Sequence, residues 1–240
     1  MPAGQEQQLC YTIDMTNPFK LFEKRDWVLW IGSMVILTIA GIATPDTDPL
    51  TLIMTLFGVT TLIFSAVGSI WAPVITIAFC VMYAVIAWGY RYWSEVITFL
   101  GLSVPMSVAS LVTWIRNPSK REGEVKVRTL SRRTCILIVV ASIPVTAFFG
   151  VVLRKLNTPN LSVSTVSITT SFLGAAFIVL RSPWYALGYA LNDIVLIVLW
   201  TLASLTDPKY IPVVVEFVIF LVNDLYAFYS WRRRERELSK

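Results

Sequence analysis

Long runs of apolar residues, separated by short polar or proline-containing breaks, make up most of the chain. Eight runs come near the roughly 20 residues that a helix needs to cross a hydrocarbon core about 30 Å thick. The pattern therefore predicts eight membrane-spanning helices. They cover residues 27–43, 50–70, a third run from the break at 71–73 to about 88–92, then 95–115, 134–153, 161–180, 181–200 and 210–231. Pro105 interrupts the fourth span, which a membrane helix tolerates when neighbours satisfy the freed carbonyl.

Composition agrees with this pattern. The 240 residues are 56% hydrophobic and only 15% charged, with a mean hydropathy of +0.68. Soluble domains carry about 25% charged residues. We therefore expect an all-α integral membrane protein.

Several kinds of chemistry are excluded by the residues that are missing. The chain has no histidine, the commonest metal ligand and general base. Cys10, Cys80 and Cys135 are scattered, without the spacing of a disulfide framework or a zinc site. No Gly-rich phosphate loop or paired nucleophile and base is present. We predict no catalytic residue, metal or cofactor, and the polar segment 1–14 does not resemble a cleaved signal peptide.

Basic residues gather on one side of the predicted spans. Three precede the first span, seven lie in the hydrophilic loop 116–133, Arg181 follows the sixth span and five lie after Trp231. Only Arg91, Arg154, Lys155 and Lys209 fall on the other side. Since cytoplasmic loops are enriched in Lys and Arg, both termini are predicted to be cytoplasmic. A nucleic-acid partner is not expected.

Tryptophans suggest an internal repeat. One opens the middle helix of spans two to four and of spans six to eight, and another closes it 17 or 16 residues later. The fifth span would restore the orientation between these two three-helix units, which gives a 3+1+3 arrangement plus an N-terminal helix. Trp also gathers at membrane interfaces without any repeat. The expected units are residues 1–48 (tail and extra helix), 49–116 (first repeat), 117–160 (hinge loop and linker helix), 161–231 (second repeat) and 232–240 (basic cytoplasmic tail).

The last two spans each contain an Asn-Asp pair at membrane depth, Asn192-Asp193 and Asn223-Asp224. An ionisable residue at the middle of a membrane helix costs roughly 2.5–3.5 kcal/mol on insertion scales, so it indicates a functional site. Tyr185, Tyr189 and Asn192 share one helical face, with Trp184 beside them. The corresponding residues of the last span are Glu216, Phe220, Asn223 and Tyr226 or Ala227. Amides and aromatic rings suit a flat neutral or cationic heterocycle with hydroxyls, such as a nucleoside or vitamin.

Other interpretations of these residues stay open. Asp193 and Asp224 lie one residue off the proposed face and could link helices by hydrogen bonds worth about 0.6–2 kcal/mol. Tyr83 and Trp88 of the third span are further candidates for substrate contact. Glu95 is expected to be solvated or paired with Arg91. The tryptophans expected to anchor the protein at the membrane interface are Trp27, Trp30, Trp114 and Trp231.

The strings RSPWYALGYALNDIVLIVLW and FVIFLVNDLYAFYSWRR resemble the two C-terminal helices of the PnuC family of vitamin transporters. Tyr83, the stretch 90–95 and Val104-Pro105-Met106 ahead of Trp114 are similar to that family's N-terminal repeat. The resemblance covers roughly residues 50–236. It implies a full-length SWEET-like fold, a homotrimer in the bacterial inner membrane, and facilitated diffusion of nicotinamide riboside. It also implies that a cytoplasmic kinase traps the vitamin by phosphorylation.

One departure leaves the vitamin open. Many members of that family read WxxW before the central amide, whereas Trp184 is followed here by Tyr185, Ala186 and Leu187. Related proteins carry thiamine or riboflavin, and cationic thiamine would suit the same pocket. Two further hypotheses are a proton-coupled nucleoside transporter, in which Asp193, Glu216 or Asp224 titrates, and a membrane scaffold that transports nothing. An enzyme is the least favoured class.

Overall fold

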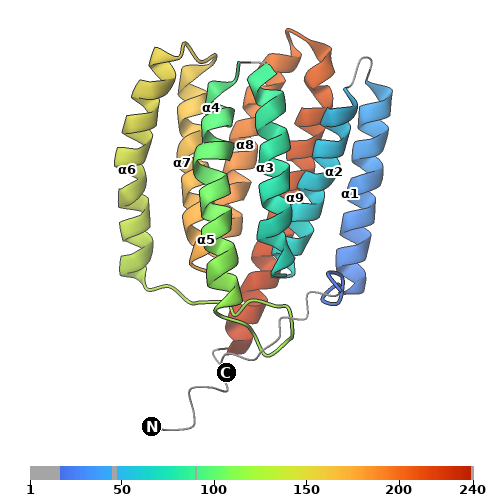
Figure 1. Ribbon diagram of the computed structural model, residues 1–240, viewed down its shortest axis with the longest axis vertical. Helices are drawn as coiled ribbons and strands as arrows, with labels where there is room; N and C mark the ends of the chain where they lie inside the picture. Colours follow the sequence, from blue (N-terminus) through green and yellow to red (C-terminus); the bar gives the residue numbers. More distant parts are fainter. Residues whose placement is uncertain (1–16, 45–47, 90, 239–240) are drawn as a thin grey trace.

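The computed structural model describes residues 17–44, 48–89 and 91–238, and eight helices in these ranges are long and apolar enough to cross a membrane (Figure 1). The prediction of an all-α membrane protein with eight spans is confirmed. The polar N-terminal segment 1–14, with Cys10, and the residue Tyr90 lie outside the described residues. The elements are α1 (Lys24–Ala43), α2 (Pro49–Ala66), α3 (Trp71–Gly89), α4 (Trp93–Val96), η2 (Ile97–Ser103), α5 (Val104–Ile115), α6 (Arg132–Lys155), α7 (Leu161–Val179), α8 (Trp184–Ser204), η3 (Pro208–Tyr210) and α9 (Ile211–Leu238).

Local sequence sets where several helices begin. The side chain of Glu23 and that of Asp26 cap the start of α1 reciprocally, which satisfies amide groups that no helical carbonyl reaches. Pro49 opens α2, where a missing N–H is harmless. The Ser131 hydroxyl accepts a hydrogen bond from the Thr134 amide at 3.2 Å and caps α6.

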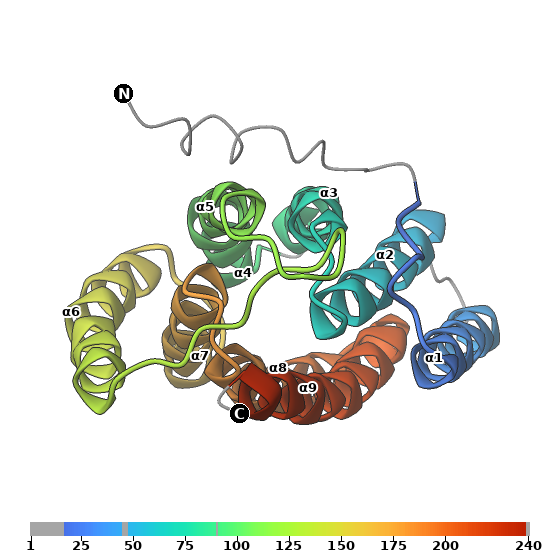
Figure 2. The same ribbon diagram turned by 90° about the horizontal axis from the view of Figure 1, so that it is seen from below.

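Six helices form a ring, in the order α2, α3, α5, α7, α8 and α9, with α9 packing back on α2 (Figure 2). α1 packs outside the ring against α2 and α9, and α6 packs outside it against α7. Two contacts join the first three helices of the ring to the last three: α5 packs on α7, and α9 packs on α2. This order is what two parallel three-helix units joined by α6 produce.

The fourth span is three elements rather than one helix. A π-helical segment, η2, separates the single turn α4 from α5, and Pro105 is the second residue of α5. Because proline lacks an N–H and its ring clashes with the preceding turn, Pro105 disturbs the helical hydrogen bonds of the turn before it. Wider π-helical turns are a common way for a helix to absorb such a break.

The predicted basic tail is not separate from the last span. α9 continues through Trp231 to Leu238. Ion pairs three and four residues apart, Arg232 with Glu235 and Arg233 with Glu237, support the extension. The helix therefore projects beyond the bundle at the end where the 116–131 loop also lies (Figure 1). We call this end of the molecule the basic end.

The 116–131 loop, in which the sequence predicts the hinge between the two halves, is attached to the bundle. Its residues 123–128, which we call the strap, cross the basic end of the ring (Figure 2). The Val125 amide donates to the Gly68 carbonyl at 2.9 Å, and the Arg128 amide donates to the Arg181 carbonyl at 2.9 Å. Val125 and Val127 are buried. The strap thus joins the α2–α3 turn to the α7–α8 turn.

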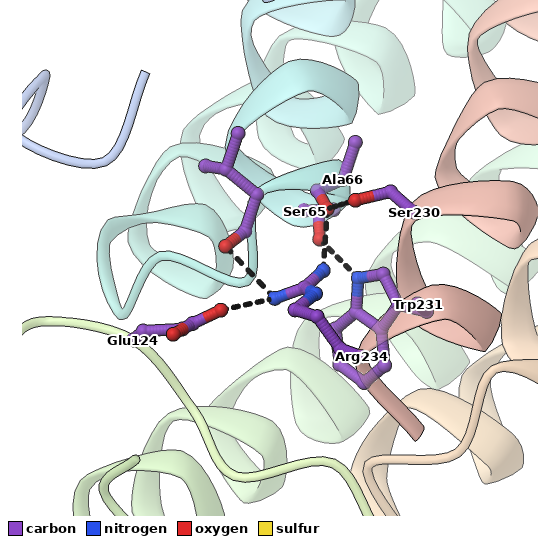
Figure 3. Close-up of polar contacts among 7 residues, drawn as sticks. Ser65, Ala66, Glu124, Ser230, Trp231 and Arg234 are labelled. Atoms are coloured by element: carbon purple, nitrogen blue, oxygen red, sulfur yellow. Dashed lines mark hydrogen bonds and ion pairs between the residues drawn. The ribbon is translucent and has the colours of Figure 1, made fainter. Parts of the chain in front are cut away.

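Arg234 of α9 holds the same region together (Figure 3). Its guanidinium donates to the Ala66 carbonyl at 2.6 Å, to the Val67 carbonyl at 3.0 Å and to the Glu124 carboxylate at 2.9 Å. The first two acceptors are carbonyls at the end of α2, which lack helical partners. One side chain therefore caps α2 and binds the strap.

Candidate functional site

A cavity of about 90 Å³ lies inside the ring. That space holds several water molecules, so a ligand of vitamin size requires the surrounding helices or side chains to move. Hydroxyl groups from both halves of the ring line it. They are Thr61, Ser65, Thr76, Ser103, Ser107, Ser110 and Ser171.

One face of α8 supplies the aromatic and amide groups of the cavity. Tyr185, Tyr189 and Asn192 all line it, as their helical spacing predicts. The Asn192 Oδ1 atom accepts hydrogen bonds from Thr170 Oγ1 at 2.8 Å and from Ser171 Oγ at 3.0 Å. These two bonds from α7 fix the amide plane and leave its Nδ2 group as the donor for a ligand.

Tyr189 is positioned by a close contact between α7 and α8. A Cβ atom on Gly174 would lie 2.6 Å from Tyr189 Cδ1, and one on Gly188 would lie 2.6 Å from the Gly174 backbone nitrogen. Distances this short leave no room for any side chain. The two glycines therefore let the helices approach and press the Tyr189 ring against α7.

Two carboxyl groups meet in the cavity wall, Asp193 of α8 and Asp224 of α9. Their exposed fractions are 3% and 1%, and the two side chains lie next to each other. The Oδ2 atom of each has no hydrogen-bond partner in the described part of the protein. Within that part, no Lys or Arg lines the cavity. The cavity is therefore suited to positive charge.

Aromatic side chains cover the cavity at the end away from the strap. The rings of Tyr83 and Phe99 lie 4.0 Å apart between centroids, and Trp200 Nε1 donates to Tyr83 Oη at 2.9 Å. Tyr92 packs edge-on against Trp200 at 5.0 Å, and burial raises its pKa. The Tyr83–Trp200 bond joins the two halves of the ring.

At the basic end, Trp114 and Trp231 close the space between the cavity and the strap. Both are completely buried, with ring centroids 5.7 Å apart. Each indole donates to a backbone carbonyl of another helix: Trp114 to Ile178 at 3.2 Å and Trp231 to Ser65 at 2.9 Å. They were predicted to anchor the protein at the membrane interface. The structure shows them instead as packing residues between helices.

Three residues predicted on the corresponding face of α9 do not line the cavity. Asn223 Nδ2 donates to Ser33 Oγ of α1 at 3.2 Å, so this amide links α9 to the outer helix. Tyr226 Oη donates to Asp26 Oδ1 at 2.7 Å, also at the start of α1. Glu216 is completely buried beside Gly58, next to the cavity wall rather than in it.

The predicted tryptophans are also placed elsewhere. Trp184 is 39% exposed at the start of α8, with the Arg232 guanidinium 5.7 Å from its ring. Trp88 is 61% exposed and packs on Trp93. The expectation for Glu95 was wrong as well, because it is fully buried and accepts a hydrogen bond from the Ser167 hydroxyl at 3.4 Å.

Sequence reasoning missed one side of the cavity. The hydroxyls of Ser103, Ser107 and Ser110 lie at helical spacing (i, i+4, i+7), which is the signal that would have identified them. For the two aspartates, helix linkage and titration in a proton-coupled transporter were left as open alternatives, and neither was placed on the predicted cavity face. Their place in the cavity wall depends on how α8 and α9 are rotated against each other.

A ring of membrane-spanning helices around an internal cavity lined by aromatic, hydroxyl, amide and carboxyl side chains is typical of a membrane transporter. Residues 48–233 match the family described as nicotinamide mononucleotide transporter. The chain belongs to this family, and the predicted relation to PnuC proteins is confirmed. The nicotinamide riboside transporter PnuC of Haemophilus influenzae is 25% identical over 227 residues, which are 92% of this chain and 93% of that protein.

Two further comparisons agree. The nicotinamide riboside transporter PnuC of Neisseria mucosa is 24% identical over 158 residues, which are 63% of this chain and 60% of that protein, less than two thirds of its length. A crystal structure of the vitamin B3 transporter PnuC has a TM-score of 0.80 at 20% identity and covers 90% of this chain and 94% of that one. At this identity the structural match supports the fold.

Proposed function

We propose that this protein carries nicotinamide riboside across a membrane and performs no catalysis. The names of the two relatives support this substrate, and the family description names the related mononucleotide. The observation that carries the proposal is the cavity itself. Tyr185, Tyr189 and Asn192 offer two aromatic rings and an oriented amide inside the helix ring of a transporter family. In this arrangement the tyrosines line the pyridinium and the amide bonds the ribose or carboxamide.

Charge decides between the riboside and its mononucleotide. Both have a cationic pyridinium ring, but the mononucleotide adds a phosphate. Phosphate sites in proteins use Arg, Lys or helix N-termini, whereas this cavity is lined by Asp193 and Asp224 and, among the described residues, by no basic side chain. A phosphate would be repelled by the carboxyl pair, so the riboside is the better fit.

The distribution of basic residues supports an orientation in the membrane, and the helix ring supports a mechanism. The basic end faces the cytoplasm of a bacterial inner membrane, because positive residues are retained there. The two three-helix units move against each other and expose the cavity to one side at a time, with the Tyr83–Trp200 bond and the strap on opposite sides of it. Transport is facilitated diffusion, and cytoplasmic phosphorylation retains the vitamin.

Calorimetry on the purified protein tests the substrate. Nicotinamide riboside, nicotinamide mononucleotide, thiamine and riboflavin are titrated separately. The riboside is expected to bind saturably and the mononucleotide to bind at least roughly tenfold more weakly, given one extra repelled anionic group. Thiamine or riboflavin binding in place of the riboside would show that the cavity serves another vitamin. Absence of saturable binding by all four compounds would contradict a role in vitamin transport.

A further inference from the structure

One face of α9 is exposed on the outside of the bundle and changes character along its length. Its exposed residues follow helical spacing (i, i+4, i+7, i+11, i+18) and are Val218, Val222, Leu225, Tyr229 and Arg236. The exposed fractions of the first four lie between 46% and 58%. We call this face the α9 stripe. It runs from aliphatic side chains through a tyrosine to an arginine at the basic end.

The polar end of the α9 stripe borders a groove of about 550 Å³. The groove is lined by Phe228, Tyr229, Arg232, Arg233, Arg236 and Glu237. Arg232 pairs with Glu235, and Arg233 Nε donates to Glu237 at 3.1 Å. Three arginines and these two glutamates leave a surplus of one positive charge. Because a guanidinium has five N–H donors, the ion pairs leave donors for a bound anion.

Helix length places the groove at the membrane surface. The predominantly apolar part of α9, residues 211–231, rises about 30 Å, which is the thickness of the hydrocarbon core. The headgroup layer adds roughly 5–8 Å on each side. From Arg232 to Arg236 the helix rises about 6 Å, so these arginines lie within that layer. Trp184, with the Arg232 guanidinium 5.7 Å from its ring, is at the same level, and Trp gathers at membrane interfaces.

The order of chemical groups along the α9 stripe matches that of a phospholipid. Acyl chains suit the aliphatic side chains of residues 218–225, the glycerol backbone suits Tyr229, and a phosphate suits the arginines. Charge decides between kinds of lipid. A zwitterionic headgroup has no net charge, whereas an anionic headgroup complements the surplus of positive charge in the groove.

We propose that the groove on α9 binds the headgroup of an anionic phospholipid from the surrounding bilayer. The phosphate lies between Arg233 and Arg236, and an acyl chain follows the α9 stripe. This site is separate from the cavity inside the ring and does not depend on which vitamin is transported. The bound lipid holds the extension of α9 at the membrane surface, beside Arg234, which binds the strap.

Native mass spectrometry of the purified full-length protein tests the site. The protein is titrated with phosphatidylglycerol and, separately, with phosphatidylcholine of the same acyl chains, and the Kd of the first bound lipid is measured. One surplus positive charge corresponds to at least about fivefold tighter binding of phosphatidylglycerol. Arg233→Gln combined with Arg236→Gln should bring the two Kd values within about twofold of each other. Both side chains are exposed, so this double variant is expected to fold.

A second double variant separates a bound lipid from general attraction of lipid to the basic end. Arg132→Gln combined with Arg133→Gln removes two exposed positive charges at the start of α6, at the same end of the molecule but outside the groove. It should leave the preference for phosphatidylglycerol unchanged. A parallel titration contains excess inorganic phosphate. This ion is expected not to displace the lipid, because it lacks the acyl chains that contact the α9 stripe.

Several results would overturn the lipid site. They are equal binding of the two lipids and a preference that persists in the groove variant. An equal loss in the α6 variant would show attraction by total charge instead of a site. Displacement by inorganic phosphate would assign the groove to a soluble anion. A change in the number of protein copies per complex in the groove variant would assign this face to a contact between copies. Each of these results refutes the lipid site and leaves the proposed transport function unaffected.

Discussion

Asn192 and Asn223 provide a matched pair of substitutions with different expected results. Both are buried asparagines followed by aspartate on neighbouring helices, but only Asn192 lines the cavity. Asn192→Ala removes the amide that Thr170 and Ser171 orient toward the ligand. Loss of one or two hydrogen bonds to the substrate corresponds to about 1–2 kcal/mol, or roughly a 5- to 30-fold weaker Kd.

Asn223→Ala breaks the bond to Ser33 of α1, 3.2 Å long. Hydrogen bonds between membrane helices average about 0.6 kcal/mol, so this variant should unfold a few degrees earlier and keep its Kd within about twofold. Calorimetry with nicotinamide riboside gives Kd, and thermal unfolding in the same detergent gives stability. If Asn223→Ala lost binding while Asn192→Ala kept it, the placement of the two amides would be refuted.

Three further substitutions test other parts of the molecule. Gly174→Ala places a Cβ atom 2.6 Å from the Tyr189 ring. Riboside uptake by cells should therefore fall at least roughly tenfold at equal membrane abundance. Unchanged uptake would show that Tyr189 need not hold its position. Arg234→Met removes the cap of α2 and the partner of Glu124, so it should destabilise the protein by about 2–3 kcal/mol in thermal unfolding. Arg234→Lys should have an intermediate effect. An unchanged unfolding midpoint would contradict the capping role. Trp88→Ala should not alter the riboside Kd, because this side chain is 61% exposed, and a tenfold loss would return Trp88 to the binding site.

The sequence predicts the number and class of the elements well because the membrane imposes them. A span must be apolar over roughly 20 residues, and interruptions such as Pro105 are visible in the sequence. The cavity face of α8 was also predictable. Tyr185, Tyr189 and Asn192 follow helical spacing, and the structure brings them together as that spacing requires.

The rest depends on tertiary packing. In an Asn-Asp pair the two side chains point about 100° apart on the helix, so which of them faces the cavity depends on the rotation of that helix. α8 turns both Asn192 and Asp193 inward, whereas α9 turns only Asp224 inward. Asn223 meets α1 instead, a helix outside the repeat that no spacing within the last span could reveal.

The strap has a practical consequence for following the transport cycle. In the strap, the buried residues Val125 and Val127 alternate with the exposed residues Lys126 and Arg128. The exposed edge is therefore held in one conformation only while Val125 and Val127 stay packed against the bundle. Since the strap is hydrogen-bonded to a turn of each three-helix unit, separating those turns must dislodge it. An antibody fragment selected against this outer edge would therefore distinguish conformations, binding the protein when the basic end is closed and dissociating when it opens.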